Sequence, residues 1–229
     1  MGKRLITQRR GRGGSHYRSP SHRHVDDVRL PQFDEGEGTI KDLIQAPGRT
    51  SPLAVIDFNG VTDYQLAAAG TKVGQKIYVG GYKVAPGSIS TLSRIPEGTP
   101  VHNIEGKPGD GGKFAKTAGS SATVVSRGEK VVVLMPSGAM KEFNPNCRAA
   151  IGVVAGGGRG DKPLAKAGKN YLTLRSRSTA NKKVKGVAMN AVDHPHGGGS
   201  HPHVGGPNCQ KRTASPGQKV GFLPKKKRK

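Results

Sequence analysis

The sequence is poor in the residues that build a large apolar core. Of 229 residues, aromatic residues make up 4%, tryptophan is absent and hydrophobic residues total 33%. Glycine and proline, with 35 and 16 residues, together exceed a fifth of the chain. A chain of this composition cannot fill one well-packed core over its whole length. We therefore expect small compact modules joined to extended segments that depend on a partner for their order.

Cysteine and long apolar runs are scarce too. Cys147 and Cys209 are the two cysteines and form no CxxC pair, so neither a disulfide framework nor a cysteine-based zinc site is indicated. No apolar run approaches the roughly 18 residues needed to span a bilayer. The arginine-rich start lacks the apolar segment of a signal peptide. These absences predict a cytoplasmic protein with no membrane partner.

Acidic residues are few, and their distribution is uneven. The chain has 38 Lys+Arg against 15 Asp+Glu, a formal net charge of +23 and a pI of about 10.4. Residues 1–24 carry +7 with no acid, residues 25–100 carry −2, residues 101–175 carry +7 and residues 176–229 carry +11. Both ends are therefore basic arms, and the partner they predict is a polyanion.

Short apolar stretches between glycine-rich turns predict a mainly β fold. The turn signals are Asn59-Gly60, Gly80-Gly81 and 136–138 (Pro-Ser-Gly), at a spacing typical of small antiparallel barrels, the second of SH3 size. We expect a short helix or turn at 89–95, one or two helical turns at 162–169, and little regular structure after 176. The expected strands are 51–58, 61–69, 76–79, 101–105, 123–127, 130–135, 140–143 and 150–154.

These elements predict four segments along the chain. They are a basic N-terminal arm (1–35), a first barrel (36–98), a second barrel (99–175) and a basic His/Gly-rich C-terminal extension (176–229). Residues 1–24 lack any hydrophobic period, which fits either a solvated tail or an arginine-rich arm that orders on nucleic acid. We favour the arm, because arginine forks suit phosphate and RNA bases better than lysine does.

Residues 184–206, VKGVAMNAVDHPHGGGSHPHVGG, form the most distinctive stretch. They hold four of the eight histidines and too few apolar residues to offset the entropy of their own ordering. The bare amides of Gly197, Gly198 and Gly199 could approach a phosphate closely. Basic residues flank the stretch on both sides, so its predicted partner is anionic.

The histidines also raise a metal site and a hydrolase as alternatives. The pairs His194/His196 and His201/His203 could ligate zinc, copper or nickel. We expect the two histidines of each pair to point opposite ways, however, and Asp193 is the one nearby carboxylate. Asp193 and His194 with a serine lack the apolar pocket wall that catalysis needs. We expect no enzyme activity, no cofactor and no metal; the histidines are expected to stack on bases and donate hydrogen bonds to RNA, with Asp193 holding one imidazole.

Other motifs leave further alternatives open. GGGRG at 156–160 lacks the ending and the strand-loop-helix context of a phosphate-binding loop. PKKKRK at 224–229 fits either a nuclear import signal or a nucleic-acid patch. A chromatin or DNA-binding protein would share the charge, but the chain lacks a recognition helix, heptads and zinc spacing.

MNAVDHPHGGG at 189–199, with KGVAMN before it and KVGF at 219–222, is more specific. It resembles the universal large-subunit ribosomal protein family conventionally called L-two. GKRLITQRRGRGG at the start and HPHVGG at 201–206 resemble the archaeal and eukaryotic branch of that family. The resemblance covers nearly the full length. One departure is Ala191, which stands where the bacterial form has proline and removes one backbone restraint.

The resemblance implies an OB-fold barrel followed by an SH3-like barrel, with long irregular basic N- and C-terminal extensions. It implies a structural constituent of the large ribosomal subunit, a primary ribosomal RNA binder near the peptidyl-transferase centre. Such a protein supports subunit association, tRNA binding and peptide-bond formation, while the reaction belongs to the RNA. The implied partners are large-subunit rRNA, small-subunit rRNA at the interface and neighbouring ribosomal proteins, with no small-molecule substrate.

Within the motif, His194 matches the family position most often tied to activity of the centre. The charge pattern and the resemblance together predict a set of rRNA-binding residues in both arms. They are Arg4, Arg9, Arg10, Arg12, Lys182, Lys183, Lys185, Met189, Asn190, Asp193, His194, His196, Gly197, Gly198, Gly199, His201, His203, Lys211 and Arg212.

Overall fold

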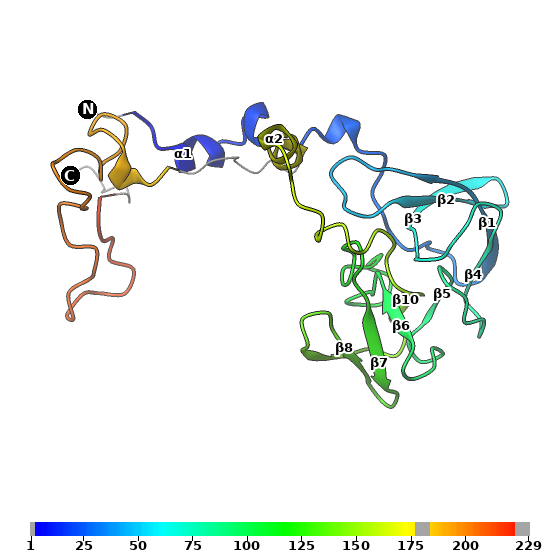
Figure 1. The fold of residues 1–229 in the computed structure, drawn as a ribbon. Coiled ribbons are helices and arrows are strands. Elements are labelled where there is room, and N and C mark those ends of the chain that lie inside the picture. Colours follow the sequence, from blue (N-terminus) through cyan, green and yellow to red (C-terminus); the bar gives the residue numbers. More distant parts are fainter. Residues whose placement is uncertain (1–2, 177–183, 223–229) are drawn as a thin grey trace. The chain divides into compact units, whose positions relative to one another are not determined.

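The computed structural model describes residues 3–176 and 184–222 (Figure 1). The chain divides into two compact units: His22–Ala165, and a second unit that joins Met1–Ser21 to Lys166–Lys229. No helix in the described part is long and apolar enough to cross a membrane. The first of these units holds the β structure and is called the sheet unit below. The second is called the arm unit.

The sheet unit is built on ten strands, so the predicted mainly β fold is confirmed. Their order in the sheet is β3-β2-β1-β4-β5-β10-β6-β7-β8-β9. Neighbouring strands pair antiparallel, apart from β4 and β5, which are parallel. The strands are β1 (Gly36–Ile44), β2 (Leu53–Phe58), β3 (Val61–Leu66), β4 (Lys76–Val79), β5 (Ile89–Thr91), β6 (Pro100–His102), β7 (Ala122–Ser126), β8 (Val131–Leu134), β9 (Met140–Phe143) and β10 (Arg148–Ile151).

The first half of the sheet closes on an apolar core from β1, β2, β4 and β5, which includes Ile40, Ile56 and Ile77. The β2–β3 hairpin follows the prediction made from Asn59-Gly60. Both residues have positive φ, 51° and 91°, as a two-residue hairpin turn requires. The Asp57 carboxylate accepts the Gly60 N–H at 2.9 Å and fixes the turn.

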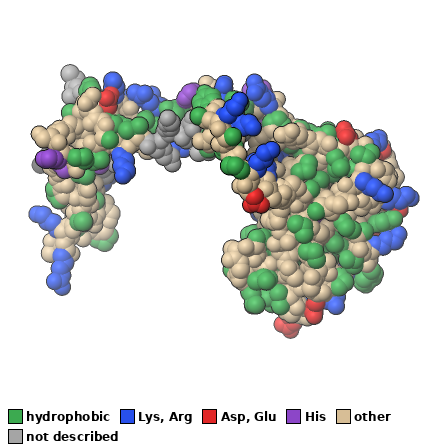
Figure 2. Space-filling model, in the orientation of Figure 1, with side chains coloured by type: hydrophobic (Ala, Val, Ile, Leu, Met, Phe, Trp, Pro, Cys, Tyr) green, Lys and Arg blue, Asp and Glu red, His purple; other side chains and the backbone are tan. Residues whose placement is uncertain are grey.

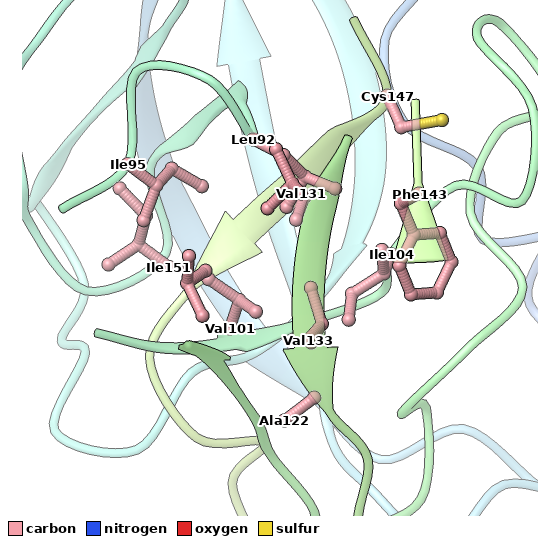
Figure 3. Close-up of a cluster of buried hydrophobic side chains, with 12 residues drawn as sticks. Leu92, Ile95, Val101, Ile104, Ala122, Val131, Val133, Phe143, Cys147 and Ile151 are labelled. Atoms are coloured by element: carbon pink, nitrogen blue, oxygen red, sulfur yellow. The ribbon is translucent and has the colours of Figure 1, made fainter. Parts of the chain in front are cut away.

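The second half closes on a separate core, shown in Figure 3, with side chains from strands and from the segments between them. Val131 and Val133 alternate into it from β8, as the two-residue period of a strand requires. The predicted turn at 136–138 is confirmed: Gly138 has φ 83°, and the Met135 N–H donates to the Ala139 carbonyl.

Strand β10 joins the two halves, because it pairs with β5 on one side and β6 on the other. Its successive residues enter opposite cores. Ala149 and Ile151 pack in the core of the second half, while Ala150 packs in the core of the first. One four-residue strand therefore closes both cores.

A buried ion pair fastens the segment before β1 to the second half. The Glu105 side chain is 0% exposed, and its carboxylate accepts from the Arg148 guanidinium at 3.1 Å and the Arg148 N–H at 2.9 Å. The same guanidinium donates to the carbonyls of Pro31 at 2.6 Å and Phe33 at 3.3 Å. Leu30 adds a backbone bond to a glycine carbonyl in the 105–112 loop and is itself buried.

Several sequence expectations need correction. Strand β1 was not predicted, because glycines and charges fill it and a register shift between Ile40 and Asp42 breaks its alternation. Residues 89–95 were expected as helix or turn; the turn is confirmed at 92–94, but Ile89–Thr91 before it forms strand β5. The helix expected at 162–169 lies later, as α2 (Ala167–Ser176). The remaining predicted strands lie within about three residues of the observed ones, and 76–79 and 140–143 match.

The arm unit contains short helical segments that the sequence did not predict. They are α1 (Ile6–Gly11) and the 3-10 turns η1 (Ser15–Tyr17) and η3 (Gly186–Ala188); a further turn, η2 (Ser21–Arg23), spans the boundary with the sheet unit. Helix α1, η1 and η3 bury no residue. These short helices therefore add no side chain to a buried core, although Arg10, Tyr17 and Val187 are half-buried.

Candidate nucleic-acid interface

Residues 186–199 of the arm unit fold into a closed loop, here called the histidine loop. The Asn190 carbonyl accepts the N–H groups of Asp193 at 3.0 Å and His194 at 3.3 Å, which makes a tight turn. The Gly198 N–H then donates to the Met189 carbonyl at 3.0 Å and closes the ring of backbone bonds. The loop is thus shaped by its own backbone rather than by an apolar core.

The glycines of this loop are needed for its closure. A Cβ at Gly197 would overlap the carbonyls of Met189 and Asn190, and Gly198 and Gly199 have φ of 85° and 90°. The amides of Gly197 and Gly198 donate inside the loop, to His194 and Met189. Those two amides therefore serve loop closure rather than the phosphate contact that the sequence suggested for them.

His194 is held on two sides. Its ring lies against the Cα of Gly186, where an added Cβ would stand 2.6 Å from Nε2. The His196 N–H donates to His194 Nδ1 at 3.0 Å, and the two rings meet edge to face at 4.8 Å. Because Nδ1 accepts this bond, the neutral ring carries its proton on Nε2. His194 therefore offers an N–H donor from Nε2.

The expected geometry of the histidines is wrong at this pair. We expected His194 and His196 to point opposite ways, but residues two apart in an extended segment share a face, and the two rings meet edge to face after the turn at Asn190. His196 also packs edge to face on Phe222, 6.3 Å between ring centroids. No group of three or more His, Cys, Asp or Glu side chains that could hold a metal ion occurs among the residues the structure describes.

Asp193 does not hold an imidazole as expected. Its carboxylate pairs with the Lys3 ammonium, with 2.8 Å between Nζ and Oδ1. The Lys3 N–H donates to the Val192 carbonyl at 2.9 Å. The start of the chain is thus bonded to the histidine loop, 190 residues away in sequence.

The predicted basic residues that the structure describes lie at the surface of the arm unit, and Figure 2 shows lysine and arginine side chains exposed there. Arg9 and Arg10 occupy the last turn of α1. Arg10 also lines a cavity of about 380 Å³ together with Thr7, Gly11 and Tyr17. The predicted residues that are exposed are Arg4, Arg9, Arg12, Lys185, Asn190, Gly199, His201, His203, Lys211 and Arg212.

Two of the predicted residues, Lys182 and Lys183, lie outside the described residues, as does the PKKKRK run at 224–229. Three residues that shape the loop were missed: Lys3, Gly186 and Phe222. Gly186 and Phe222 fall within the KGVAMN and KVGF stretches, so those stretches carried the signal. Lys3 had no such signal, because charge alone does not select it among the 21 basic residues of the arm unit.

Comparisons with known proteins show which family the chain resembles. The family described as Ribosomal Proteins L2, C-terminal domain, matches residues 85–219. A protein of Thermoplasma acidophilum named Large ribosomal subunit protein uL2 is 50% identical, over 100% of this chain and 98% of the relative. Proteins of the same name from Archaeoglobus fulgidus and Methanothermobacter thermautotrophicus are 50% and 48% identical, over 97% of this chain and 96% of each relative.

Proposed function

The chain belongs to the family of large ribosomal subunit protein uL2, and we propose on that basis that it is a structural constituent of the large ribosomal subunit that binds its ribosomal RNA. The observation that carries this proposal is the identity of about half over essentially the full length of the relatives. A protein with this role acts on the ribosome in the cytoplasm and catalyses no reaction itself.

The charge of the arm unit supports RNA as the partner. Met1–Ser21 and Lys166–Lys229 hold 21 basic residues and one acidic residue. Such a surface releases counterions when it meets phosphates, and arginine forks match phosphate geometry. The basic residues of the predicted rRNA-binding set, from Arg4 in the first arm to Arg212 in the second, are proposed to make these contacts.

The architecture fits the modules of the family. The first half of the sheet, with its own core, is proposed as an OB-fold-like barrel at 36–98, and the second half as an SH3-like barrel at 99–175. The two largest of the three apolar clusters, centred one in each half, support this division. The arms at 1–35 and 176–229 are proposed to reach RNA too crowded for a globular module.

The histidine loop is proposed to lie near the peptidyl-transferase centre. Its contribution is a rigid donor: the His194 ring is fixed by Gly186 and His196, and its Nε2–H can donate to a phosphate, ribose or base oxygen. Through such contacts the protein would support tRNA binding, peptide-bond formation and association with the small subunit. The small-subunit rRNA and neighbouring ribosomal proteins are its further proposed partners.

The test is a filter-binding titration of the purified full chain against large-subunit rRNA, repeated over a series of salt concentrations. Each phosphate contact contributes a slope of about 0.7–0.9 log units in affinity per log unit of salt. Removing Arg9 and Arg10 together should therefore reduce the salt slope by the contribution of two phosphate contacts, about 1.4–1.8 log units in affinity per log unit of salt. The matched control removes Lys72 and Lys83 from the near-neutral half of the sheet and should leave the slope unchanged.

Two results would contradict the proposal. The first is a shallow salt slope for the unaltered chain. The second is preferential binding of duplex DNA in competition with rRNA. Sedimentation of cell extract through a sucrose gradient gives an independent readout, because the chain should travel with large subunits.

A further inference from the structure

The one negative charge of the arm unit lies in the loop that is to face RNA. Asp193 is the sole acid among Met1–Ser21 and Lys166–Lys229, against 21 basic residues. Its side chain is 36% exposed. A free carboxylate at this place would repel a phosphate, so its pairing with Lys3 removes an unfavourable charge from the interface.

Lys3 is joined to the loop by two bonds of different kinds. Its ammonium pairs with Asp193 at 2.8 Å, and its backbone N–H donates to the Val192 carbonyl at 2.9 Å. The Lys3 side chain is 60% exposed, and an ion pair at that exposure contributes little to stability. Two bonds from one residue do, however, define where the loop lies relative to the start of the chain.

The bonded residues stand directly before His194. The N–H groups of Asp193 and His194 both donate to the Asn190 carbonyl, so a shift of Asp193 moves the backbone that carries the imidazole. The contacts of His194 with Gly186 and His196 depend on that backbone. Lys3 can therefore act on His194 indirectly: it bonds to Asp193, and the backbone of Asp193 carries His194.

We propose that Lys3 is a positioning residue for His194, and that its bonds to Val192 and Asp193 make the N-terminal arm and the histidine loop bind RNA as one body. The second half of this statement rests on the proposed function, and the first half does not. The first half concerns the protein alone and can be tested without RNA.

The first experiment records the imidazole nitrogen and carbon resonances of the full chain by NMR, with His194 assigned through a His194→Gln variant. Lys3→Ala should shift the His194 resonances, because it removes the ion pair that holds Asp193. Arg4→Ala is the matched control: it removes the same charge from the next residue and should leave them in place. Equal shifts in the two variants, or none in either, would overturn the proposal.

The second experiment measures rRNA affinity by filter binding and exchanges the two charges. Lys3→Glu places like charges together and should weaken binding about two- to fivefold more than Arg4→Glu does. Adding Asp193→Lys to Lys3→Glu restores an ion pair with the charges exchanged. The double variant should regain the affinity that Lys3→Glu loses beyond Arg4→Glu. An exchange variant that binds no better than Lys3→Glu would refute the coupled binding. Failure of the unaltered chain to bind rRNA would refute the proposed function, while the NMR result would still decide the positioning.

Discussion

Replacing Arg148 by methionine tests the buried ion pair at the centre of the sheet unit. The change removes the guanidinium from a carboxylate that is 0% exposed, and leaves the carbonyls of Pro31 and Phe33 without their donor. The Glu105 carboxylate keeps backbone donors from Arg148, Gly109 and Gly111, at 2.9, 3.3 and 3.4 Å, but loses its counter-charge.

An uncompensated buried charge costs about 3–5 kcal/mol. That cost is a large part of the stability of an ordinary domain, about 5–15 kcal/mol. For a unit of this size it corresponds to a fall in Tm of about 6–20 °C. The measurement is urea and thermal unfolding of the full chain at neutral pH, followed by circular dichroism.

Two further variants make the result decisive. Arg127→Met breaks an exposed pair with Glu97, 4.0 Å apart, and should cost less than about 1 kcal/mol. Glu105→Gln combined with Arg148→Met removes the buried charge as well, so the double variant should be more stable than Arg148→Met alone. The reasoning is refuted if Arg148→Met costs no more than Arg127→Met, or if the double variant is the less stable of the two.

Two other predictions concern histidines. Burial lowers the pKa of His102 against the opposing bond to the Gly152 carbonyl, so the folded protein keeps this ring neutral where the unfolded chain binds a proton. The free energy of unfolding should therefore fall by about 1.4 kcal/mol per pH unit as pH drops below about 6.5, until the folded pKa is reached. Urea unfolding of His102→Gln at several pH values should show a free energy of unfolding that depends less on pH below about 6.5. An unchanged pH dependence would contradict the role given to His102. In the histidine loop, Gly186→Ala should displace the His194 ring. If the proposed function holds, it should lower peptide-bond formation by reconstituted subunits, as is expected of His194→Ala, while leaving the Tm of the sheet unit unchanged. Gly168→Ala in α2 meets open space and is the control; equal activity of the two alanine variants would count against the contact.

The sequence predicted elements whose signals are local. Asn59-Gly60 favours positive φ at two successive residues, and the hairpin there follows from that preference alone. Strand β1 was not predicted because the register shift between Ile40 and Asp42 interrupts its alternation of apolar and polar residues. Strand β5 escaped because its partner β10 lies more than 50 residues later, and nothing near residue 89 indicates that pairing.

The same distinction holds at the site. The DHPH motif located the loop, because its residue types are unusual and close together. Its geometry could not be predicted. The glycine and proline pattern indicates an extended segment, but the hydrogen bond from the Gly198 N–H to the Met189 carbonyl closes it into a loop. The role of Asp193 was misassigned for a similar reason: its partner is 190 residues away, and no local pattern connects the two.

The shared strand β10 also constrains the order in which the nascent protein can mature. Ala150 completes the first core, yet it leaves the ribosome long after β1–β5 have been synthesised. Until then β5 has an unpaired edge where Arg148–Ile151 will dock. During translation the first half of the sheet therefore stays incomplete, exposed to proteases and to pairing with other strands. Both cores are completed when β10, at the end of the second half, has been synthesised.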